Sequence, residues 1–89
     1  MRPPPRLFVA ARVLLGQNQI EVAHDSGMSS RTIYKIENAA ANIILVEKLM
    51  RHYSSKGISF ISPDGNSGWG IKSSFLNSSY DDEHETSER

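Results

Sequence analysis

The stretch from Gly16 to Asn38, GQNQIEVAHDSGMSSRTIYKIEN, decides the fold of this chain. Asn18 is a good N-cap, and an apolar stripe follows it on one side of a short helix, formed by Ile20, Val22 and Ala23. Gly27 ends that helix, because glycine adopts the left-handed backbone of a helix end without steric cost. The sequence therefore predicts two short helices around the turn Ser26-Gly27-Met28-Ser29.

The second of these helices is expected from about Ser30 to Asn38, with Ser29 as its cap, and its two sides differ. Ile33 and Ile36 lie three residues apart and form the apolar side. The other side carries donor-rich side chains and no acid: Ser30, Arg31, Thr32, Tyr34 and Lys35. Such a surface suits a helix that lies in the major groove of DNA, where the base edges are open to hydrogen bonding.

This stretch resembles the lambda-repressor/Cro-like, or Xre-type, helix-turn-helix family of DNA-binding domains. The shared pattern is Gly-x-[Ser/Asn]-Gln-x-x-[Leu/Val]-Ala-x-x-x-Gly-x-Ser-x-x-Thr-[Ile/Val]-x-x-[Ile/Leu]-Glu-Asn, and nearly every fixed position is filled. The likeness spans roughly residues 6 to 72, with a first helix at Leu7 to Leu15 and a fourth at Asn42 to Ser55. It implies a mainly α fold, a four- to five-helix lambda-repressor-like DNA-binding domain with a short C-terminal β-hairpin.

The chain departs from the family pattern directly after Asn38. The family usually has glycine there, but Ala39-Ala40-Ala41 follows, so the helix either runs on or ends differently. Asn42 is the evident cap candidate for the fourth helix.

The resemblance assigns base readout and phosphate contacts to particular residues. Its base-reading positions correspond to Ser30, Arg31 and Lys35, while Thr32 and Tyr34 are expected to meet a thymine methyl group or a phosphate. Arg31 is the strongest candidate, because its fork donates two hydrogen bonds to guanine. Phosphate contacts are expected from Asn18, Gln19, Ser29, Asn38 and Arg6. An ordinary surface role stays open for Gln19.

Arg12 and Glu37 correspond to positions that form a buried ion pair in many members of the family. Such a pair fixes the orientation of the first helix against the end of the third more than it adds stability. Two separate solvated charges are the alternative.

Size and composition fit one small soluble domain. A domain of 89 residues buries only about 60% of its unfolded surface, so dimerisation would add stability. The chain has no cysteine, which excludes disulfides and thiolate metal sites and fits the cytoplasm. No apolar run approaches the roughly 20 residues of a membrane span, and the start of the chain does not resemble a secretory signal.

Charge is divided unevenly along the chain, although the formal net charge is zero. Residues 1 to 56 carry eight basic and four acidic side chains, a net charge of +4. Residues 57 to 89 carry two basic and six acidic side chains, a net charge of −4. The helical part therefore has the basic character expected of a nucleic-acid binder.

Four segments follow from these patterns. Residues 1–5 are expected to form a flexible, proline-rich arm. Arg2 in this arm, and Arg6 just after it, are able to reach DNA. A disordered leader is the simpler interpretation. Residues 6–56 form the helical domain, in which Leu7, Ala11 and Leu14 share one face and the fourth helix points Val46, Leu49, Met50 and Tyr53 inward. Residues 57–72 form a hairpin, and 73–89 an acidic tail that is expected to be disordered.

An isolated hairpin is only marginally stable, so this one needs a partner surface. That surface is either the chain's own helices or the same hairpin in a second subunit. The residues expected at such a homodimer contact are Ile58, Phe60, Trp69 and Ile71.

Enzyme chemistry is not indicated. His24, His52 and His84 are isolated from one another, so neither a metal site nor catalytic residues are expected, and no cofactor is implied. A sequence-specific, dimeric transcriptional regulator, most simply a repressor of a pseudo-palindromic operator, is the favoured function. The alternative is an antitoxin or anti-activator that mainly binds a protein, and contact with RNA polymerase or a toxin is compatible with either.

Overall fold

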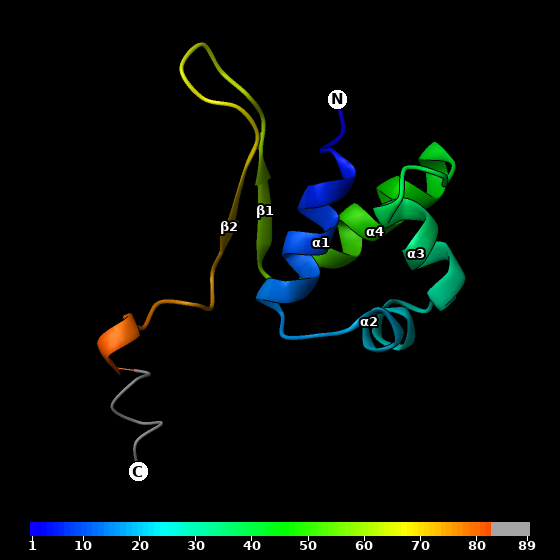
Figure 1. The fold of residues 1–89 in the computed structure, drawn as a ribbon, viewed down its shortest axis with the longest axis horizontal. Coiled ribbons are helices and arrows are strands. Elements are labelled where there is room, and N and C mark those ends of the chain that lie inside the picture. The colour runs from blue at the N-terminus through cyan, green and yellow to red at the C-terminus, as the bar shows by residue number, and fades with distance from the viewer. Residues whose placement is uncertain (83–89) are drawn as a thin grey trace.

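Helices make up the N-terminal part of the domain, and a two-stranded hairpin follows them (Figure 1). The computed structural model describes residues 1–82. Within these residues the order is α1 (Pro5–Leu14), α2 (Gln19–Ser26), α3 (Ser30–Glu37), α4 (Ile43–Ser55), β1 (Ile58–Ile61) and β2 (Gly70–Ser73). A fifth, short helical segment begins at residue 80. The predicted mainly α fold with a C-terminal hairpin is confirmed. Residues 83–89 of the tail, for which disorder is expected, lie outside the described residues.

Helix α1 begins two residues earlier than the sequence pattern suggests. Pro5 is its first residue, a position where the missing N–H costs nothing and the fixed φ already fits a helix. The residues before it are packed rather than free, because Pro3 is buried and the Arg2 guanidinium donates to Glu47 in α4. Phe8 and Ala11 form the buried side of α1, so Ala11 is buried as predicted, whereas Leu7 and Leu14 are only half-buried.

Helix α2 begins and ends at the predicted residues, and helix α3 begins at its predicted residue. The Asn18 side chain accepts from the backbone N–H of Glu21, and the Glu21 carboxylate accepts from the N–H of Asn18, so both ends of a capping box are present. Gly27 ends α2 with φ 73°, and Ser29 caps α3 through the N–H of Thr32. One expectation is wrong, because Ile20 is 70% exposed and not part of the apolar stripe.

Helix α3 ends at Glu37 and does not run on into the alanines. Ala39 takes the left-handed conformation, with φ 62°, where glycine would be the comfortable residue. The backbone N–H of Ala40 then donates to the carbonyl of Lys35 over 2.8 Å, which closes the end of the helix. Asn42 caps α4 through the N–H of Leu45, as predicted.

The core lies where α1, α3, α4 and the inner face of the hairpin meet. Its largest buried side chains are Phe8, Ile33, Leu49, Tyr53 and Ile58. The Phe8 ring lies 5.5 Å from the Phe60 ring and 6.4 Å from the Tyr53 ring, measured between centroids. Within residues 1–82, every helix is too short or too polar to cross a lipid bilayer.

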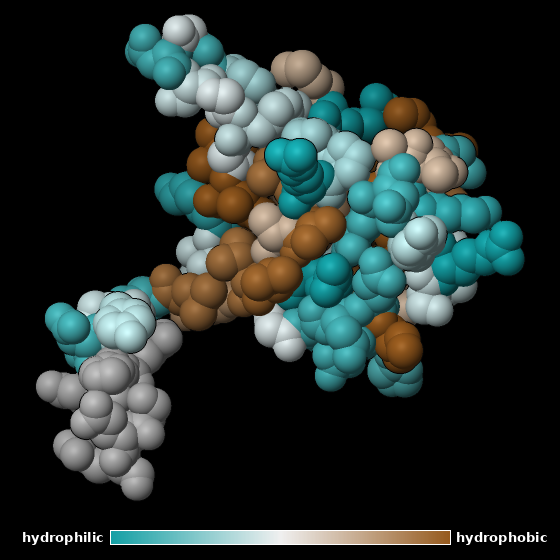
Figure 2. Space-filling model, viewed as in Figure 1, coloured by the Kyte–Doolittle hydropathy of each residue, from teal (hydrophilic) through white to brown (hydrophobic). Residues whose placement is uncertain are grey.

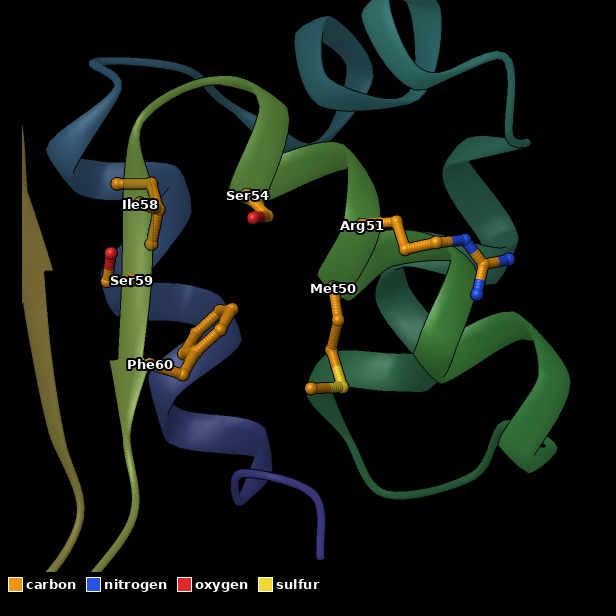
Figure 3. A pocket seen from close by; sticks show the side chains of 6 residues that line it. All are labelled: Met50, Arg51, Ser54, Ile58, Ser59 and Phe60. Carbon is orange, nitrogen blue, oxygen red and sulfur yellow. The ribbon is translucent and has the colours of Figure 1, made fainter.

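The hairpin uses its inner face for the chain's own core. Strands β1 and β2 are antiparallel, with Phe60 opposite Ile71. Ile58 is only 2% exposed, so the prediction that it contacts a second subunit is wrong. Phe60 is half-buried and points from β1 toward α4, across a hollow of about 420 Å³ beside Met50 (Figure 3). The hairpin thus obtains from the helices the partner surface that it needs.

Candidate nucleic-acid interface

Helix α3 presents a polar side to solvent and an apolar side to the core. Ser30, Arg31, Tyr34 and Lys35 are exposed, whereas Ile33 and Ile36 are almost completely buried. The eight-residue helix therefore holds four of its five predicted base-reading residues on the outside of the molecule. Side chains placed in this way are able to reach a surface laid against the helix.

Thr32 is the one predicted base-reading residue that is not fully exposed. Its hydroxyl lies 2.9 Å from the Ser29 hydroxyl, and its backbone N–H donates to the same Ser29 oxygen. Thr32 is half-buried. Thr32 is therefore tied to Ser29, the residue that caps α3.

The orientation of α3 is fixed by a network around the Glu37 carboxylate, whose side chain is only 3% exposed. Arg12 donates to it from Nε over 2.8 Å and from Nη2 over 3.1 Å, a bidentate pair. The hydrogen bond that the Arg12 guanidinium donates to Glu37 raises the pKa of Arg12 above its ordinary value. The predicted ion pair between α1 and the end of α3 is present.

Gln19 belongs to the same network, which the sequence did not reveal. Its Nε2 amide donates to Glu37 Oε1 over 2.9 Å and so ties the start of α2 to the end of α3. Gln19 thus acts in the structure as a brace between the two helices. An amide at the first position of α2 was the available signal, but its partner depends on how the helices pack.

The other expected phosphate contacts are distributed differently. The side chains of Asn18 and Ser29 accept backbone N–H bonds at helix starts, and the Asn38 amide donates to the carbonyl of Tyr34. All three are exposed beside α2 and α3. Arg6 is not brought to this surface, since it lines a groove between α1 and β2 together with Ile71.

Carboxylates of the helical part are occupied by other partners. Glu37 pairs with Arg12, Glu47 with Arg2, and Asp25 with Lys56 at 3.4 Å. A hydrogen bond from Gln17, and then the charge of Lys56, lower the pKa of Asp25. The basic side chains without a carboxylate partner within residues 1–82 are Arg6, Arg31, Lys35, Lys48, Arg51 and Lys72. Positive charge on α3 is therefore not neutralised by its neighbours.

The described residues do not assemble a metal centre. No group of three or more histidine, cysteine, aspartate or glutamate side chains comes together within residues 1–82. No protein-family model matches the chain, and none of the curated proteins is similar enough to be a relative. The geometry of α2 and α3 is therefore the basis for a functional interpretation.

Proposed function

We propose that this chain is a sequence-specific, double-stranded DNA-binding transcriptional regulator of the helix-turn-helix type, acting as a homodimeric repressor on a pseudo-palindromic operator. The single observation that carries the proposal is the outer side of α3. Arg31 and Lys35 are exposed there without carboxylate partners, on a helix whose other side is buried. A short, rigidly held helix with donors outward is what major-groove readout requires.

The supports of α3 agree with this function. Base readout needs a recognition helix whose position and orientation are fixed. The network of Arg12, Glu37 and Gln19 provides this, because it ties α3 to both α1 and α2. The free backbone N–H groups at the start of α2 lie beside the same surface, and helix starts attract phosphate. We infer that α2 rests on the DNA backbone while α3 enters the groove.

A dimer would present two copies of α3 to one face of the duplex. In that arrangement the two helices lie about 34 to 36 Å apart, one turn of B-DNA. The operator would then be a pseudo-palindrome whose half-sites have matching spacing. Zero net charge is compatible with binding, because the helical part carries the positive charge and residues 57 to 89 the negative charge.

The proposal is tested by selecting bound sequences from a random DNA pool and measuring their affinities at several salt concentrations. We expect a pseudo-palindromic site, and an affinity that falls steeply with salt as counterions are released. Arg31→Ala should weaken the selected site by roughly 5- to 150-fold while changing non-specific binding much less.

The matched control is Arg51→Ala. This variant removes the same charge from α4, where Arg51 lines the hollow beside β1 (Figure 3). It should leave the sequence preference intact. The proposal fails if no oligonucleotide competes better than bulk genomic fragments, or if Arg31→Ala retains the full preference.

A further inference from the structure

An apolar groove lies between α1 and β2. It has a volume of about 530 Å³, and apart from Arg6 its lining is aliphatic: Val9, Ala10, Val13, Leu14 and Ile71. The Val13 side chain is 63% exposed, so the groove leaves apolar surface open to solvent. Figure 2 shows this apolar surface running across α1 and on toward the chain that follows β2. Two more exposed apolar side chains lie in that chain, Phe75 at 39% and Leu76 at 51%.

The outer edge of β2 runs beside the groove and has unpaired backbone groups. The backbone N–H of Ser74 donates to the carbonyl of Gly57, so in the alternating antiparallel pattern Lys72 and Ser59 bond to each other. Ile71 and Ser73, at the intervening positions, must then direct their N–H and C=O groups away from β1. An open edge of this kind is a template for another strand.

We propose that this α1–β2 face docks a second copy of the chain about a two-fold axis, with the two β2 edges paired antiparallel. The inference deepens the proposed function, because it rests on the homodimer and identifies its contact surface. A two-fold contact needs a self-complementary surface, and here a free strand edge and an apolar groove lie side by side. Strand β2 of the partner continues the sheet and places the partner's Ile71 over Val9 and Val13.

Charge on this face favours the same occupant. Arg6 borders the groove and Lys72 is exposed on β2, whereas Asp81 and Asp82 follow the strand in sequence. The segment after β2 leaves the domain on the β2 side, away from the helices (Figure 1). In a two-fold arrangement each acidic segment therefore extends toward the basic rim of the other copy.

The charge of Lys72 favours one register for the pairing of the two β2 strands. Pairing centred on Lys72 would place the two Lys72 side chains directly opposite each other, which is unfavourable for like charges. Centring the pair on Ile71 places Lys72 opposite Gly70 of the second copy and removes that repulsion. Helix α3 lies on the far side of the molecule from β2 (Figure 1), so docking leaves both copies of α3 exposed.

The experiment is the molar mass of the full chain in solution, measured by light scattering after gel filtration, without DNA. We expect twice the 9.9 kDa chain mass at micromolar concentration. Val13→Glu should raise the dimer dissociation constant by about 100-fold or more, because it places an unpaired charge in the contact. The matched control is Ile44→Glu, since Ile44 is 73% exposed on α4, outside the groove. The control should dimerise like the parent chain.

Ser73→Pro tests the strand pairing separately. Because the N–H of Ser73 points away from β1, proline removes a donor that only the second copy would use. We expect weaker dimerisation with an unchanged circular dichroism spectrum. A Ser73→Pro chain that dimerises like the parent overturns the paired edges.

The inference as a whole is overturned if the parent chain is monomeric at high micromolar concentration, or if Ile44→Glu dissociates the dimer as strongly as Val13→Glu. Failure of the DNA proposal gives a different result, namely an intact dimer that selects no sequence. A monomeric Val13→Glu chain that still binds a single half-site supports both proposals.

Discussion

Replacing Glu37 by alanine removes the carboxylate that joins three helices. Glu37 accepts from Arg12 Nε and Nη2 and from Gln19 Nε2, over 2.8, 3.1 and 2.9 Å. The alanine variant leaves the Arg12 guanidinium, 18% exposed, without its counter-charge and the Gln19 amide without its acceptor. Removing one partner of such a buried pair costs about 3 to 5 kcal/mol. A domain of this size has a total free energy of unfolding of roughly 5 to 15 kcal/mol, so the loss is a large part of it.

The assay is urea unfolding followed by circular dichroism, and the chain provides its own control. Arg2 and Glu47 also form an ion pair, and their 2.6 Å contact is shorter than any in the Glu37 network. Their side chains are 37% and 44% exposed, however, and solvent-exposed pairs contribute only about 0 to 1 kcal/mol. Glu47→Ala should therefore cost much less than Glu37→Ala, although it breaks the shorter contact.

The reasoning is refuted if the two alanine variants lose similar stability, because burial would then not decide the cost. The double variant Arg12→Met/Glu37→Leu should recover most of the loss, since it removes both charges together and keeps apolar volume. A double variant that is as unstable as Glu37→Ala would show that the defect is a cavity and not an unpaired charge.

Two further predictions concern backbone strain and pH. Ala39→Gly should raise the free energy of unfolding by about 0.5 to 1 kcal/mol, because the left-handed conformation of Ala39 costs about 1 to 2 kcal/mol and the added chain entropy offsets only part of that. Ala40→Gly is its control in thermal melts, and an equal gain there would contradict the explanation. Burial, and then the charge of Lys56, lower the pKa of His52 below 6.5, so the unfolded chain binds this proton more readily and stability should fall as pH drops from 6.5 toward the folded-state pKa. His52→Gln should flatten that pH dependence, whereas His24→Asn, which removes an exposed imidazole, should leave it in place.

Local signals in the sequence predicted the helix boundaries of the motif well. Asn18, Ser29 and Asn42 each cap a helix, and Gly27 ends one, because these features depend on a few neighbouring residues. The Arg12–Glu37 pair was found through the resemblance and not through the local pattern. Spacing along the chain does not show that side chains 25 residues apart will meet.

The phase of helices α1 and α2 was harder to predict. Ile20 is apolar but 70% exposed, and Phe8 replaces Leu7 at the buried side of α1. In helices of ten and eight residues that are rich in apolar side chains, several stripes fit the sequence nearly equally. Only the position of the neighbouring helices decides which stripe is buried, and that information is not local.

The hairpin shows why an apolar strand does not by itself identify a dimer contact. Ile58 and Phe60 alternate as an interface strand would, yet their side chains complete the aromatic and aliphatic core beside Phe8 and Tyr53. A hairpin has only one inner face, and packing it on α1 and α4 uses Ile58 and Phe60, which leaves Ile61 as the one exposed apolar side chain of β1. A broader apolar surface for a partner therefore has to come from elsewhere. It comes from the outer side of α1, where Val13 stands beside Ile71 and the free edge of β2.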